Sequence, residues 1–148
     1  MTSQPDRTSV EAEAETVVVQ VPADADYLGV IRSAAAHVAT KAGCTLPEVA
    51  DLRLAVDEAC NLLLRHTVPD PRAEGPGGAG GAGDLECRFV LDGSTLRVVL
   101  GLRAGDVDPP GDGDFGWTIL AALVDDIVWR VEGPVVQIEI VKHRAAGI

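Results

Sequence analysis

The sequence has few basic residues and few aromatic ones. Its 148 residues contain 12 Lys and Arg against 23 Asp and Glu, which gives a formal net charge of −11. Direct binding to nucleic acid is therefore not expected, because Lys and Arg contacts to phosphate dominate such affinity. Aromatic residues make up 3% of a chain that is 47% hydrophobic, so Val, Ala and Leu must build most of the core. The acidic balance serves solubility or suits a basic protein partner.

Cysteines and long apolar segments are also scarce. The three cysteines, Cys44, Cys60 and Cys87, cannot close a disulfide framework, and they show no CxxC or Cys/His metal spacing. We expect reduced, structural thiols, and the sequence leaves redox regulation open as an alternative. No apolar run approaches transmembrane length and the N-terminus has no apolar signal core. These features predict a soluble, cytoplasmic protein without a membrane partner.

The pattern predicts one domain, residues 15–143, with a tail at each end. Residues 1–14 are expected to be a disordered acidic lead, and residues 144–148 a short tail. Residues 73–84 are rich in glycine. They lack the phosphate-loop pattern and a following helix, so we expect a flexible connection there.

Residues 46–66 form the clearest predicted helix. Thr45 and Glu48 have the spacing of a capping box, and Pro47 falls in the first turn, where its missing N–H costs nothing. One apolar stripe runs along it, formed by Val49, Leu52, Val56, Ala59 and Leu63. A preceding helix begins near Tyr27 and ends at Gly43, a typical C-terminal cap.

The remaining segments predict strands and one more helix. Strands are expected at residues 15–21, 85–91, 95–102, 127–132 and 135–141, and a helix at 115–126. Residues 103–114 form a turn-rich loop, and the sequence VPDP ends the long helix. The order predicts an α+β fold, a two-layer sandwich of a mixed, mostly antiparallel sheet with helices on one face.

With these elements in this order, two segments resemble a known family. VPADADYLGVIRSAAAHVATKAGCTLPEVADLRLAVDEAC (residues 21–60) is similar to the N-terminal half of the RsbW/SpoIIAB-type anti-sigma factor serine kinases, in the histidine-kinase-like ATPase (GHKL) superfamily. DFGWTILAALVDDIVWRV and VVQIEIVK resemble that family's last helix and hairpin. The resemblance implies an ATP pocket between helices and sheet, with ATP and Mg²⁺ as cofactors. It also implies three partners: an alternative sigma factor, an anti-anti-sigma (STAS-type) protein, and a second copy in a homodimer.

The catalytic helix of that family is altered in this chain. The family places a carboxylate base and a Mg²⁺-binding amide four residues apart, about 40° from each other on one helical face. Glu58 occupies the carboxylate position, but Leu62 stands where the amide belongs, and Asn61 comes one residue early. His66 matches the family's histidine, so the register is fixed. Glu58 also has an alternative interpretation, as a polar partner of Arg65 on the same helix.

The phosphate and adenine positions are altered as well. Leu102 is the nearest counterpart of the family's adenine-binding Asp, with Asp106 as a displaced substitute. In the family's G-x-G before the last helix, Asp114 replaces the first glycine, while Gly116 is kept and Gly113 could serve if the loop shifts. An anion at this helix N-terminus would repel phosphate.

The sequence thus predicts an anti-sigma factor with a degenerate nucleotide site, and enzymatic activity stays open. No resident cofactor and no metal ligand set are expected, with ATP/Mg²⁺ only if the site still binds. The remnant of the ATP pocket comprises Glu58, Asn61, His66, Gly113 and Gly116. Tyr27 and Arg32, in DYLGVIRS, match the family's partner-facing region, although Arg32 also fits an ordinary solvated helix residue. The alternative function is an active kinase that phosphorylates its antagonist, with Glu58 as the catalytic base.

Overall fold

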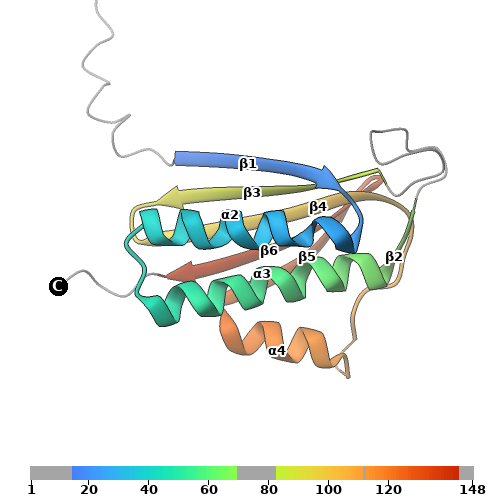
Figure 1. Ribbon diagram of the computed structural model, residues 1–148. Coiled ribbons are helices and arrows are strands. Elements are labelled where there is room, and N and C mark those ends of the chain that lie inside the picture. The colour runs from blue at the N-terminus through green and yellow to red at the C-terminus, as the bar shows by residue number, and fades with distance from the viewer. Residues whose placement is uncertain (1–14, 70–82, 112, 144–148) are drawn as a thin grey trace, which may run out of the picture.

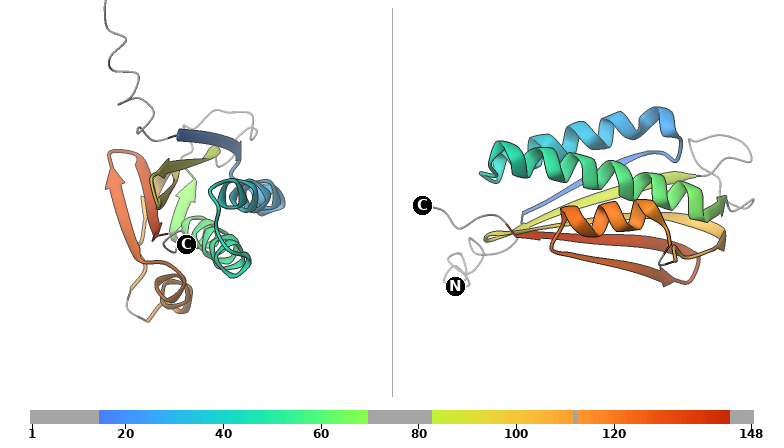
Figure 2. Two further views of the ribbon diagram at one scale, coloured as in Figure 1. Left: turned by 90° about the vertical axis from the view of Figure 1, so that its left-hand side faces the viewer. Right: turned by 90° about the horizontal axis from the view of Figure 1, so that it is seen from below.

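The computed structural model describes residues 15–69, 83–111 and 113–143. Within these ranges, three α-helices cover one face of an antiparallel sheet (Figures 1 and 2). In chain order the elements are β1 (Glu15–Pro22), the 3₁₀ turn η2 (Ala25–Tyr27), α2 (Leu28–Lys41), α3 (Leu46–His66), β2 (Thr67–Pro69), β3 (Asp84–Asp92), β4 (Thr95–Val107), α4 (Phe115–Leu123), β5 (Asp126–Glu132) and β6 (Val135–His143).

The sheet has the strand order β1-β3-β4-β6-β5, and the short β2 pairs with the far end of β4. All the strand pairings made by the described residues are antiparallel. The predicted α+β two-layer fold with helices on one face is therefore confirmed, with a sheet that is antiparallel rather than mixed. Helices α2 and α3 lie against the sheet, and α4 lies beside α3 next to β5 (Figure 2).

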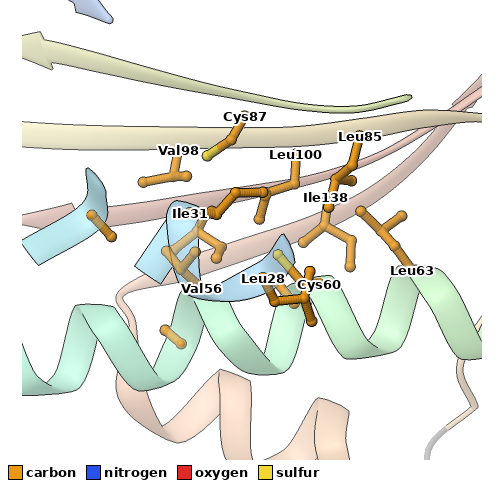
Figure 3. Close-up of a cluster of buried hydrophobic side chains, with 14 of the residues drawn as sticks. Leu28, Ile31, Val56, Cys60, Leu63, Leu85, Cys87, Val98, Leu100 and Ile138 are labelled. Carbon is orange, nitrogen blue, oxygen red and sulfur yellow. The ribbon is translucent and has the colours of Figure 1, made fainter. Parts of the chain in front are cut away.

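The core lies between the two layers. Along β3, the buried Leu85, Cys87 and Phe89 alternate with the exposed Glu86 and Arg88, as expected for a strand with one solvated face. Figure 3 shows this inner face meeting residues of α2 and α3, among them Leu28, Ile31, Val56, Cys60 and Leu63. Burying each large aliphatic side chain in this layer contributes about 1.5–3 kcal/mol to folding.

The predicted start of α3 and the predicted end of α2 are both confirmed. Thr45 caps α3: its Oγ1 accepts from the N–H of Glu48 at 3.3 Å, while the Glu48 carboxylate accepts from the N–H of Thr45 at 2.7 Å. Gly43 follows α2 with a φ of 87°, a conformation that favours glycine. Its N–H and that of Cys44 bond back to Thr40 and Ala39, which completes a Schellman cap.

The loop before α4 is shorter than the sequence predicts. Strand β4 continues past residue 102 to Val107 because β2, which no sequence pattern predicted, pairs with it through Thr67 and Val107. Leu102 is thus a buried core residue inside the strand rather than its last residue. Helix α4 ends at Leu123 rather than at 126, since β5 already begins at Asp126.

Some predictions fall on other parts of the chain. Those for residues 1–14, 144–148 and most of the glycine-rich segment lie outside the described residues; its last residue, Asp84, belongs to β3. No helix in the described part of the chain is both long and apolar enough to cross a membrane.

The three cysteines are not joined in disulfides; Cys60 and Cys87 are buried and Cys44 is half-buried. Desolvation by burial, reinforced by the charge of Asp57, raises the pKa of Cys60 to about 12. Burial also raises the pKa of Cys87. Because the thiolate is the reactive form, both side chains act as packing residues at neutral pH.

Candidate functional site between helices α3 and α4

Helix α3 carries core leucines as well as polar side chains that reach the start of α4. Leu62 and Leu63 are fully buried in the core. Glu58 and Arg65, two helical turns apart, lie instead at the N-terminus of α4. The burial of the leucines therefore fixes the rotation of α3 about its axis, and with it the direction of the polar side chains.

Asp114 is the central residue of this region. As the N-cap of α4, its Oδ1 accepts a hydrogen bond from the N–H of Trp117 at 3.2 Å. Its Oδ2 lies 2.6 Å from Nε2 of His66, and its Oδ1 lies 3.5 Å from a guanidinium nitrogen of Arg65. One carboxylate thus caps α4 and binds both basic side chains of the last turn of α3.

Glu58 belongs to the same network through Arg65. Its Oε2 lies 3.7 Å from Nη1 of Arg65, which confirms the alternative interpretation of this glutamate as a partner of Arg65. Gly116 makes the arrangement possible: a Cβ there would lie 2.8 Å from Nη2 of Arg65 and closer still to Oε2 of Glu58. The retained glycine admits these two side chains to the start of α4.

The pKa of Asp114 reflects these contacts. Desolvation acts to raise it, but the hydrogen bond from His66, the N–H of Trp117 and the charges of His66 and Arg65 outweigh that effect. The pKa is therefore held below its usual range, and the carboxylate is ionised at neutral pH.

An open pocket of about 380 Å³ lies beside this network. Its lining residues are Glu58, Arg65, Asp114, Phe115, Gly116 and Ile119. The structure therefore brings together two residues of the predicted ATP-pocket remnant, Glu58 and Gly116, and places His66 directly behind Asp114.

The other two members of the predicted remnant do not line this pocket. Asn61 is half-buried on α3. Gly113 is an exposed turn residue, and a Cβ at this position would meet no atom within 4 Å. Leu62, at the position of the family's amide, is fully buried in the core.

The donor set of the pocket does not fit Mg²⁺-bound triphosphate. Magnesium needs oxygen ligands in near-octahedral geometry, and the position of the amide ligand holds a buried aliphatic side chain, Leu62. The α4 N-terminus, where phosphate would gain from free N–H groups, is capped by the anionic Asp114. Among the residues that the structure describes, no group of three His, Cys, Asp or Glu side chains could hold a metal ion.

A second surface lies across α2 and α3. Nη1 of Arg32 lies 2.6 Å from Oδ1 of Asp57, and 42% of the arginine side chain stays exposed. The pair borders a smaller pocket of about 250 Å³, lined by Arg32, Ala50, Arg53, Leu54 and Asp57. Tyr27, the other predicted partner residue, is the exposed N-cap of α2.

Several residues of both surfaces were not predicted from the sequence. Phe115 and Ile119 line the larger pocket. The sequence predicts only an apolar helix there, whereas the structure leaves its first residue, Phe115, exposed. Asp57 pairs with Arg32 across 25 positions, a contact that depends on how α2 packs on α3. Local spacing carries no sign of such a contact.

The fold agrees with the comparisons to known proteins. The model of the histidine kinase-like ATPase domain matches residues 21–140, so the chain belongs to that family.

Relatives within the family extend the comparison. The chain is 33% identical over 115 residues to the anti-sigma-F factor RsbW of Mycobacterium tuberculosis, covering 75% of this chain and 59% of that protein. It is 26% identical over 133 residues to the serine-protein kinase RsbW of Bacillus subtilis, covering 77% of each. The chain spans less than two thirds of the length of the mycobacterial relative.

A solved structure supports the fold. The crystal structure of the RsbU and RsbW domains of a Mycobacterium tuberculosis protein matches 88% of this chain and 32% of that one, with a TM-score of 0.64. The sequence identity is 14%, so this match bears on the architecture alone.

Replacing Leu62 by asparagine would place an amide at the position where the family resemblance implies one. It would also remove a buried leucine from the core. We expect Leu62→Asn to lower the free energy of unfolding by about 3 kcal/mol or more, because it removes a buried aliphatic group and buries an amide. Urea unfolding followed by circular dichroism measures this loss. Asn61→Ala on the same helix is the control, with an expected change within about 0.5 kcal/mol. An equally small change for Leu62→Asn would contradict the assigned burial.

The lowered pKa of Asp114 predicts a pH-dependent contribution to stability. Its folded pKa lies below its unfolded one, so the stabilisation is present above the unfolded pKa and is lost as the pH falls through the folded pKa. Asp114→Asn, which keeps a good N-cap, should therefore be less stable than the wild type near pH 6. The difference should shrink below about pH 4. Urea unfolding at several pH values tests this, and a constant difference would contradict it.

Proposed function

We propose that this chain is an anti-sigma factor that captures an alternative sigma factor through its surface, without phosphotransfer. The observation that carries the proposal is the ionised Asp114 at the N-terminus of α4, bound to His66 and Arg65 where a phosphate group would need free N–H groups. The names of the relatives supply the class of partner, since they include an anti-sigma-F factor.

The partners follow from the same relatives. We infer that an anti-anti-sigma protein of the STAS type releases the sigma factor, and that the complex acts in the cytoplasm. An acidic chain with a net charge of −11 complements a sigma factor that carries a basic DNA-binding face. Exposed apolar side chains offer contact area for such a partner: Tyr27 at the start of α2, Val30 on α2, and Leu54 on α3, which lines the same pocket as Arg32.

A homodimer is part of the proposal. Strand β1 lies at one edge of the sheet, and its Val17 and Val18 are exposed. An exposed apolar edge strand is a template for pairing with a second strand. This supports self-association through β1, at the edge of the sheet opposite to β5 and α4.

The role of Arg32 can be tested by partner binding. Arg32→Ala should weaken binding of the cognate sigma factor about tenfold or more, because a partly desolvated arginine is a common hot spot of interfaces. Arg103→Ala, an exposed arginine of β4, should change the affinity little. Titration calorimetry with the sigma factor that co-purifies from the native organism measures both. Equal effects of the two variants would remove Arg32 from the interface.

The alternative, an active serine kinase, is favoured by Glu58 in the pocket and by the kinase names of the Bacillus relatives. Under our proposal, incubation with Mg-ATP and the cognate antagonist transfers no labelled phosphate. Calorimetry with Mg-ATP alone should show a dissociation constant weaker than about 1 mM. Phosphotransfer that is present in the wild type and lost in Glu58→Ala would establish the kinase instead, and Asn61→Ala is the control for a change on the same helix.

A further inference from the structure

His66 is fixed between two hydrogen-bond acceptors. Its Nδ1 lies 2.7 Å from the carbonyl oxygen of Asp108, and its Nε2 lies 2.6 Å from Oδ2 of Asp114. The backbone holds the ring at this place, because the N–H of Asp108 donates to the carbonyl of His66 at 2.9 Å. The edge of the ring also packs against Trp129 of β5, with ring centroids 6.2 Å apart.

Neither acceptor can donate a proton to the ring. A backbone carbonyl accepts only, so Nδ1 must carry a hydrogen to bond Asp108. An ionised carboxylate also accepts only, so Nε2 must carry a hydrogen to bond Asp114. A neutral imidazole has a single N–H and would turn a lone pair toward one of these oxygens. The geometry therefore requires both ring protons.

We propose that His66 is held as an imidazolium that latches the N-terminus of α4 to the end of α3, and that loss of one ring proton releases this latch. The latch goes beyond the proposed function, since it concerns how α4 is held whether or not a sigma factor binds.

The charges around the ring support the protonated form. From α4 the ring faces the carboxylate of Asp114, and from the segment after β4 it faces the carbonyl of Asp108. On α3 itself, Arg65 is the neighbouring cation, and both Asp114 and Glu58 lie close to its guanidinium group. From β5 the uncharged ring of Trp129 contacts His66. The C-terminal end of α3 further favours a cation.

Deprotonation would change the pocket beside the latch. Without its second N–H, His66 loses the charge-assisted bond to Asp114, and the contact between Arg65 and Asp114 then remains beside the packing of the two helices. Phe115, the first residue of α4, is already 76% exposed and stands at the mouth of the α3–α4 pocket. Release of the latch therefore loosens the wall of this pocket as the pH rises.

The first test is the protonation state of His66, read from the ring ¹⁵N resonances at neutral pH. In the wild type both ring nitrogens should be protonated, whereas in Asp114→Asn one should be unprotonated, because asparagine can donate to a neutral ring. Exposed His37 on α2 is the internal reference. A single protonated ring nitrogen on His66 in the wild type would overturn the proposal.

The second test is hydrogen exchange of the α4 amides, corrected for intrinsic rates, from acid to alkaline pH. Protection in wild-type α4 should fall about tenfold as His66 loses its proton, a change typical of losing one charge-assisted bond. Amides of β6 should show no such step. In His66→Gln, which cannot titrate, α4 should show no step. Its protection should stay below that of the wild type with a protonated His66. A step of equal size in His66→Gln would overturn the latch, as would its absence in the wild type.

Discussion

The burial of one face of α3 determines the rest of the site. Leu62 and Leu63 are fully buried in the hydrophobic core, so the helix cannot rotate without exposing them. Their burial directs Glu58 and Arg65 toward α4. A residue at position 62 therefore serves the core, and the Mg²⁺-binding amide that relatives place there has no room to return without a loss of stability.

Asp114 links the N-terminus of α4 to the polar side chains at the end of α3. A helix N-terminus offers free N–H groups to an anion, and here the protein supplies the anion from its own chain. The carboxylate also binds the basic side chains at the end of α3, so the two helices are joined by polar contacts as well as by packing. A pocket whose walls are held in this way suits a protein that uses the family fold as a binding surface.

Most of the fold could be predicted from the sequence because its signals are local. The capping box of Thr45 and Glu48, the glycine cap at Gly43 and the alternation in β3 each depend on neighbours along the chain. The sequence does not predict strand β2, because three residues show no periodicity. The predicted β4 is shorter than the observed one, because the extension depends on pairing with β2. In the site, the substitutions at positions 62 and 114 were visible, whereas the contacts of Asp114 with His66 and of Arg32 with Asp57 join distant segments.

We propose that this chain holds a sigma factor by surface contacts without using nucleotide. The most direct measurement is the affinity for the co-purified sigma factor by calorimetry, with and without saturating Mg-ATP. A ligand that does not bind the chain cannot shift this equilibrium, so the account predicts the same dissociation constant in both conditions. A change of tenfold or more on adding Mg-ATP would contradict it.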